Sequence, residues 1–446
     1  MTKPREKLLK ARLHDRIDDI DALVEYVDMS LELDRAAEAD KWITKAERAL
    51  PEEPRVCLLR ARLLMCQGRT VESLAALDRA ESLGLDRAEC ELTRAVAVLA
   101  ADDHTTAIRC CESALALRPD WGKARSVLGA ALLAAERLDD ARECFEEVLR
   151  ADPDNLDARL GCADAYLELG RFDRARFAYE QVRRADPDDE DAAVGVASAL
   201  FESGRAEEAM QTLEDATTEH PRWIVALRAL MDIYRTQAHV DDSVEIGKRI
   251  LRIEDSAALR IELAALLLSQ GRHDDALEHA RRALAIDDGA FDARLLIATV
   301  AMDRGRWADA EAQIEHSMRI SGGHPNVLVA RGDLRLRQQR FEEAIADLQR
   351  ATAEAPDDAI AWKLLGAARL ATDNVVDGLA ALDRSIELEP FDPESRRLRG
   401  VGFVVREDYA AVEREIQELE PLSPKEAERL RDLVVSVRRA RSTSND

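Results

Sequence analysis

The stretch GRFDRARFAYEQVRRADPDD, residues 170–189, carries the signals that begin and end one amphipathic helix. Its opening glycine interrupts the chain, and Ala175, Tyr179 and Val182 then recur at spacings of four and three, which places them on one helical face. Pro187 cannot continue a helix interior and disfavours helical geometry in the preceding residue. The aspartates around this proline can cap a following helix. The stretch therefore predicts a helix, a turn and the start of a second helix.

The same pattern returns every 34 residues along the chain. Four prolines and four alanines share this spacing: Pro119, Pro153, Pro187 and Pro221, and Ala107, Ala141, Ala175 and Ala209. Extending the frame gives twelve repeats, at residues 20–53, 54–87, 88–121, 122–155, 156–189, 190–223, 224–256, 257–290, 291–324, 325–358, 359–392 and 393–422. Each repeat has the length and periodicity of two short amphipathic helices, and a fixed period of this size indicates a repeat architecture.

These repeats resemble the tetratricopeptide repeat family, whose helix-turn-helix units have the same 34-residue period. In the repeat that begins at 359, Trp362, Leu365 and Gly366 match the first helix of that family, and Gly378 and Pro390 match the second helix and the turn. A small residue occupies the same late position of the first helix in ten of the twelve repeats. The resemblance implies an all-α fold: a right-handed α-solenoid (superhelix) of about twelve repeats with end-capping helices.

The frame divides the chain into five segments. We expect a lead-in helix over residues 1–19 and a C-terminal capping helix with a short tail over residues 423–446. Repeats 1–6 occupy residues 20–223, and repeats 8–12 occupy residues 257–422. The seventh repeat, 224–256, fits the pattern worst and lacks one residue, so we hypothesise that it is a soft joint. Ordinary variation within a regular stack is the alternative.

The composition argues against several classes of protein. Of the 446 residues, 34% are charged and only 4% are aromatic, which favours helix over sheet. The 64 basic and 89 acidic residues give a net charge of −25, so nucleic acid is not an expected partner. No run of 18 apolar residues occurs, and the charged N-terminus lacks the apolar core of a signal peptide, so no membrane insertion is expected. Seven cysteines without a CxxC pair favour the reducing cytoplasm.

No motif for catalysis or metal binding stands out from the repeat. The acidic segments 152–157 and 186–191 lack the glycine and the twelfth-position glutamate of a calcium loop, and helix caps explain them. His273 and His279 are six residues apart, which is the wrong spacing for two ligands on one helix face. We therefore expect a protein that is not an enzyme and that needs no cofactor and no metal.

The resemblance also implies a concave surface lined by the first helices, where positions 2, 5, 9, 12 and 13 of each repeat usually meet the ligand. Positions 5 and 12 are mostly apolar here, and two adjacent repeats offer cations that could hold one carboxylate. The candidate partner-binding residues are Leu58, Met65, Leu92, Leu99, Leu133, Leu160, Leu167, Val194, Phe201, Ile261, Leu268, Met302, Lys363 and Arg397. Acids flank this strip, so we expect a partner with apolar anchors and basic flanks. Alternatively, part of the strip only supports packing between repeats.

The leading interpretation is a non-catalytic scaffold for protein–protein interaction that binds a partner helix or peptide in its concave groove. The first alternative is a regulatory or adaptor subunit that modulates a partner enzyme, a secretion system or an assembly machine. The second alternative is an enzyme whose site follows no recognised motif.

Overall fold

The structure is a computed structural model that describes residues 2–33 and 35–444, and these residues form 26 helices and no strand. The all-α prediction is confirmed. Each predicted repeat contains two helices, and we call the first the A helix and the second the B helix. An additional helix lies at each end, α1 (Thr2–Asp15) and α26 (Pro424–Ser444).

The A helices all have 13 residues and begin at or within one residue of the predicted frame: α2 (Ile20–Glu32), α4 (Pro54–Cys66), α6 (Arg87–Leu99), α8 (Gly122–Ala134), α10 (Leu156–Glu168), α12 (Glu190–Glu202), α14 (Ile224–Thr236), α16 (Ala257–Ser269), α18 (Phe291–Asp303), α20 (Pro325–Arg337), α22 (Ala359–Ala371) and α24 (Pro393–Val405). The B helices follow them: α3 (Ala36–Ala49), α5 (Thr70–Ser82), α7 (His104–Leu117), α9 (Leu138–Ala151), α11 (Phe172–Ala185), α13 (Ala206–Glu219), α15 (Val240–Ile253), α17 (His273–Ile286), α19 (Trp307–Ser321), α21 (Phe341–Glu354), α23 (Val375–Leu388) and α25 (Tyr409–Leu422).

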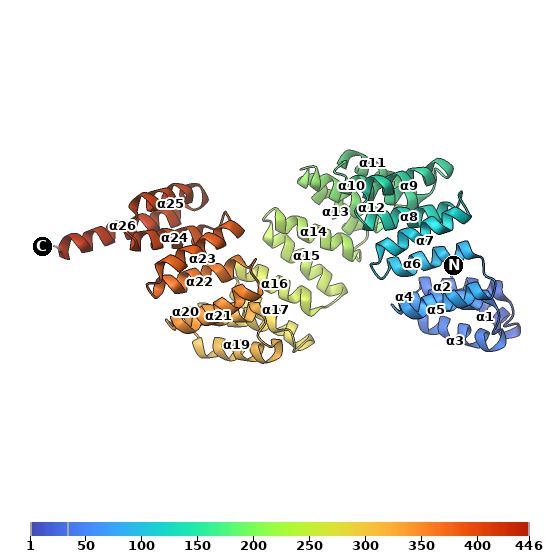
Figure 1. The fold of residues 1–446 in the computed structure, drawn as a ribbon, viewed down its shortest axis with the longest axis horizontal. Helices are drawn as coiled ribbons and strands as arrows, with labels where there is room; N and C mark the ends of the chain where they lie inside the picture. Colours follow the sequence, from blue (N-terminus) through green and yellow to red (C-terminus); the bar gives the residue numbers. More distant parts are fainter. Residues whose placement is uncertain (1, 34, 445–446) are drawn as a thin grey trace. The chain divides into compact units, whose positions relative to one another are not determined.

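The chain divides into two compact units, residues 1–239 and residues 240–446, which we call the N-terminal and C-terminal units. Within each unit the helices pack in chain order, and A helices also contact the A helix of the next repeat (Figure 1). This nearest-neighbour packing is that of an α-solenoid. The boundary lies inside the repeat 224–256, so that α14 belongs to the N-terminal unit and α15 to the C-terminal unit. That this repeat acts as a soft joint stays a prediction.

Short polar side chains begin several A helices. The Asp189 carboxylate accepts a hydrogen bond from the backbone N–H of Ala192 at 2.8 Å, and the Asn155 side chain accepts one from Ala158 at 2.9 Å. These bonds satisfy N–H groups that the first turn of a helix leaves unpaired. Asp189, one of the aspartates near Pro187, therefore acts as the cap that the sequence predicts.

The turn between the A and B helices of a repeat contains one residue in the left-handed backbone region. Glycine occupies it at Gly170 and Gly204, with φ of 68° and 81°, whereas Glu136 and Gln339 hold φ of 58° and 62°. A residue with a Cβ pays about 1–2 kcal/mol for this conformation, and glycine does not. The glycines of the 34-residue pattern are therefore conformational requirements of the turn.

We expect Gly204→Ala to destabilise the N-terminal unit by about 1 kcal/mol. A Cβ added at Gly204 meets no atom within 4 Å, so the backbone conformation alone would cause the loss. The midpoint of urea unfolding measures the effect. Glu136→Ala is the matched control because the residue at that turn already has a Cβ, and equal losses in the two variants would contradict this account.

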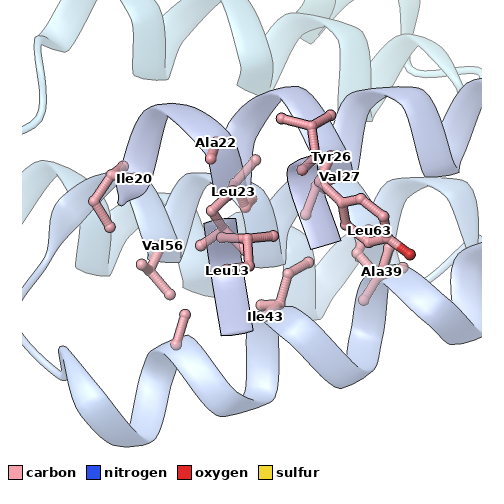
Figure 2. Packing of buried hydrophobic residues seen from close by; sticks show 13 residues of the cluster. Leu13, Ile20, Ala22, Leu23, Tyr26, Val27, Ala39, Ile43, Val56 and Leu63 are labelled. Carbon is pink, nitrogen blue, oxygen red and sulfur yellow. The ribbon is translucent and has the colours of Figure 1, made fainter. Parts of the chain in front are cut away.

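Helices at both ends of the chain cover apolar residues of the neighbouring repeat. In the cluster shown in Figure 2, Leu13 of α1 is buried beside Leu23 of α2 and Ile43 of α3. At the other end, Leu430 of α26 is buried in a cluster with Ile416 of α25. These contacts remove from water the apolar faces that a terminal repeat would otherwise expose.

Candidate functional site

A hollow of about 910 Å³ lies in the N-terminal unit between the neighbouring A helices α8 and α10, and we call it the α8–α10 hollow. Its lining residues recur at helical spacing on both helices, so one face of each helix forms a wall. On α8 the wall includes Ser126, Ala130 and Ala134, which are small. The hollow exists because these side chains leave space that larger ones would fill.

The apolar part of the wall consists largely of predicted groove residues. Leu133 of α8 and Leu160 and Leu167 of α10 all line the hollow, and each is half-buried. Leu138 and Phe145 of α9 complete this apolar surface. The structure thus brings together three of the leucines at positions 5 and 12 in one place.

Phe145 is wedged between glycines of two successive A helices. The ring is 4% exposed, and a Cβ added at Gly129 or at Gly161 would lie 2.8 Å or 2.5 Å from its Cζ atom. Either glycine therefore has to stay without a side chain for the ring to fit. Sequence reasoning missed Phe145, although a glycine in each of two successive A helices is a signal for a large side chain between them.

The polar part of the wall is acidic. Four carboxylates line the hollow: Glu136, Asp157, Asp164 and Glu168. Among the described residues, none of the four forms an ion pair, and no lysine or arginine lines the hollow. The wall therefore combines apolar surface with uncompensated negative charge, which attracts cations when the surrounding water is displaced.

Asp164 connects this wall to the core. Its carboxylate accepts a hydrogen bond from the Tyr179 hydroxyl at 2.5 Å. Burial raises the pKa of Asp164, the Tyr179 hydrogen bond lowers it, and neighbouring carboxylates such as Asp191 raise it again, so that the net pKa lies above its ordinary value. Burial and the charge of Asp164 also raise the pKa of Tyr179, so its hydroxyl stays a donor.

We expect Asp164→Asn to stabilise the fold at pH 7, with a gain that shrinks on acidification. Because the native pKa of Asp164 is above the ordinary 3.8, its ionised form destabilises the native state at pH values above that raised pKa. The native state takes up the proton before the unfolded chain does, so the penalty disappears as the pH falls toward 3.8. Urea midpoints measured between pH 7 and pH 4 check this trend.

Asp157→Asn is the control for the loss of one charge, because Asp157 is exposed on the same wall. A gain from Asp164→Asn that stays constant or grows as the pH falls would contradict the assigned direction of the shift.

The structure places the other apolar candidates on the A helices with different exposure. Three are almost fully buried, with exposed fractions of 7%, 5% and 3%: Leu58, Leu92 and Met302. Six are half-buried: Met65, Leu99, Val194, Phe201, Ile261 and Leu268. Leu92 and Met302 belong to apolar clusters that join two repeats, so they fit the packing alternative better than the groove. Leu58 packs within its own repeat and also offers little surface to a ligand.

The two cationic candidates are each paired within the chain. Lys363 Nζ lies 3.3 Å from Asp392 and 3.2 Å from Glu394, and Arg397 lies 2.9 Å from Glu426. Burial lowers the pKa of Lys363, but the two acids outweigh it and hold the pKa above its ordinary value. A carboxylate ligand would have to displace these partners.

Two further findings concern other kinds of site. Within residues 2–33 and 35–444, no three His, Cys, Asp or Glu side chains come together as a metal ion would require. No helix in the described part of the chain combines the length and the apolar character needed to cross a bilayer.

A stack of helical hairpins with A helices along one wall defines the α-solenoid class. Family models of the tetratricopeptide repeat match residues 132–194, 171–233 and 267–328 in one version, and residues 92–156 and 329–393 in another. Together these ranges cover more than half of the chain, so the chain belongs to the tetratricopeptide repeat family. Membership supports a protein-interaction scaffold, and the family is typically non-catalytic.

Solved structures of similar fold have low sequence identity to this chain. A chain of the APC/C hetero-tetramer Cut9–Hcn1 has 15% identity and a TM-score of 0.46, with 97% of this chain and 99% of that chain covered. Yeast Tom70 has 14% identity and a TM-score of 0.46, with 96% of each chain covered. A tetratricopeptide repeat protein from Parabacteroides merdae has 17% identity and a TM-score of 0.38, with 64% and 98% covered. No curated protein matches the sequence.

Proposed function

We propose that this protein is an interaction scaffold that binds a helix or peptide of a partner protein in the α8–α10 hollow. The observation that carries the proposal is the composition of the wall, in which Leu133, Leu160 and Leu167 lie beside four carboxylates without ion pairs. The complementary ligand has apolar side chains that enter the hollow and lysine or arginine beside them.

The two parts of the wall would contribute differently to binding. Each apolar side chain that leaves water for the hollow supplies about 25 cal/mol per Å² of buried apolar surface. The acids would mainly select basic partners and accelerate their association, and this contribution weakens as salt is added. An amphipathic helix with apolar residues three and four apart suits a wall built from two neighbouring helices.

An adaptor subunit is the second candidate function, and a second apolar hollow in the same unit favours it. This hollow has a volume of about 520 Å³, lies between the B helices α9 and α11, and includes Phe177, which is 57% exposed. A protein with two separate apolar hollows can hold two partners at once, as an adaptor must.

For the compartment, we propose the cytoplasm that the cysteine content predicts. All seven cysteines are free thiols in the structure. Burial raises the pKa of Cys110, Cys111, Cys144 and Cys162, which keeps these thiols protonated and unreactive. Free thiols are typical of reducing compartments.

Selection of binders from a display library of random peptides tests the proposed function. We expect the enriched peptides to share apolar residues at helical spacing next to lysine or arginine, and their affinity to fall as salt is raised. Enrichment of acidic peptides, or of peptides whose binding does not depend on the α8–α10 hollow, would overturn the proposal.

A further inference from the structure

Three hollows lie where two successive B helices meet over the A helix between them. Two are in the N-terminal unit: the α9–α11 hollow described above and an α11–α13 hollow of about 420 Å³. The third, of about 470 Å³, is in the C-terminal unit over α16, and we call it the α15–α17 hollow. Because the three share one helix arrangement, differences between them arise from their side chains.

The α15–α17 hollow differs from the other two in charge. Two carboxylates line it, from Asp275 and Glu278, against five cationic side chains: Lys248, Arg252, Arg260, Arg272 and Arg282. By contrast, arginines and carboxylates are equal in number in the α11–α13 hollow, three of each, and in the α9–α11 hollow, two of each. In a chain with a net charge of −25, the residues that line this hollow are therefore mostly cationic, and three further carboxylates, from Asp241, Glu245 and Asp255, contact these cations from outside the lining.

Arg260 of α16 is the buried element of this wall, with a side chain that is 7% exposed. Its Nε and Nη2 each donate to the Asp255 carboxylate at 2.6 Å, which fixes the plane of the guanidinium. The remaining nitrogen, Nη1, is buried and has no hydrogen-bond partner among the described residues. A buried donor without an acceptor is costly, so an anionic acceptor that reached Nη1 would stabilise this repeat.

The other cationic side chains of this wall form weak ion pairs or none. Arg272 pairs with Asp275, and Arg282 with Glu278, each at 2.7 Å and each partly or largely exposed to solvent. Arg252 is exposed and forms no ion pair within the described residues. Outside the hollow, Asp241 and Glu245 contact Arg272 and Lys248 at 3.1 and 2.6 Å. Exposed pairs of this kind are worth about 0–1 kcal/mol, so a more highly charged ligand can replace the carboxylates.

We propose that the α15–α17 hollow binds a phosphate group carried by a phosphomonoester. A phosphomonoester has a charge of about −1.5 to −2 at neutral pH and three strong acceptor oxygens, whereas a single carboxylate offers no more charge than the acids already present. Guanidinium groups match phosphate oxygens with paired hydrogen bonds. Within the same wall, burial lowers the pKa of His279 and Arg260 lowers it further, while Glu278 opposes this effect and Arg282 adds to it, so that the net pKa lies below its ordinary value.

The experiment is calorimetric titration of the full chain at low ionic strength with inorganic phosphate and with acetyl-phosphoserine-amide. We expect one saturable site and an affinity that falls about 10-fold in Arg252→Ser plus Arg282→Ser, because both side chains are exposed and can be removed without unfolding the repeat. The control is Arg176→Ser plus Arg183→Ser, which removes the same number of positive charges from the α11–α13 hollow. We expect this control to leave the affinity unchanged.

A second variant tests the buried group. Arg260→Lys keeps the charge but loses the planar fork, and we expect it to lower the affinity about 10-fold while circular dichroism shows the helices intact. If acetyl-phosphoserine-amide binds more tightly than inorganic phosphate, the phosphate group belongs to a phosphorylated polypeptide. If the two bind equally, the ligand is a free phosphate compound. Absence of a saturable site, or equal losses in the α15–α17 and α11–α13 variants, would overturn the proposal.

Discussion

Gly195→Ala is expected to destabilise the N-terminal unit by about 2 kcal/mol, although alanine is the better helix former. A Cβ at Gly195 would lie 2.5 Å from Cδ1 and Cζ of Tyr179, which is 2% exposed and is held by its hydrogen bond to Asp164. Overpacking of this kind costs about 1–3 kcal/mol, and the improved helix propensity offsets about 1 kcal/mol of it. Urea unfolding, together with hydrogen exchange of α11 and α12, measures the loss.

The next repeat suggests a second substitution that should restore the stability lost in this variant. One period later, Leu213 and Ala229 occupy the positions of Tyr179 and Gly195, and Leu213 is fully buried. Gly195→Ala combined with Tyr179→Leu copies that natural pair, so we expect the double variant to recover most of the stability that the single variant loses. Additive losses in the double variant would show that Gly195 is needed for a reason other than the tyrosine ring.

The second large effect concerns the α8–α10 hollow. We expect Leu160→Asp plus Leu167→Asp to weaken binding of a selected peptide at least about 100-fold, or about 2.7 kcal/mol. Each substitution removes an apolar contact of the ligand and adds negative charge to a wall that already holds four carboxylates. Fluorescence anisotropy of the labelled peptide measures the affinity, and circular dichroism with urea unfolding checks that the helices persist.

Leu117→Asp adds one charge and is the matched control for each single substitution, Leu160→Asp or Leu167→Asp. Leu117 ends the B helix α7 and is 50% exposed, so the substitution adds a charge to the same unit away from the hollow. It should leave the affinity unchanged. Equal losses in the control and in the hollow variants would mean that net charge, and not the hollow, determines binding.

The sequence alone could predict the repeat frame because the signals for each helix are local. Prolines in the turns, capping aspartates and left-handed glycines such as Gly170 act within a few residues, and they return with each repeat. The predicted frame therefore places the A helices within one residue of where they begin, with Arg87 in place of residue 88 as the single shift.

The location of the hollow could not be predicted because it depends on residues from separate repeats. Positions 5 and 12 are apolar along most of the chain, but Leu92 and Met302 are covered by neighbours while Leu133 and Leu160 are not. What opens the wall is the small side chains of α8, such as Ala130. Their effect follows from how adjacent helices pack, which no single repeat reveals.

Photo-crosslinking in the protein's own cells tests the central claim most directly. One variant carries the crosslinking amino acid at Leu133, inside the α8–α10 hollow, and a separate variant carries it at Phe177, in the α9–α11 hollow. We predict that Leu133 crosslinks one discrete partner protein and that Leu160→Asp plus Leu167→Asp removes this crosslink. A partner that crosslinks only at Phe177, or a Leu133 crosslink that survives the double substitution, would contradict the claim that the α8–α10 hollow is the binding site.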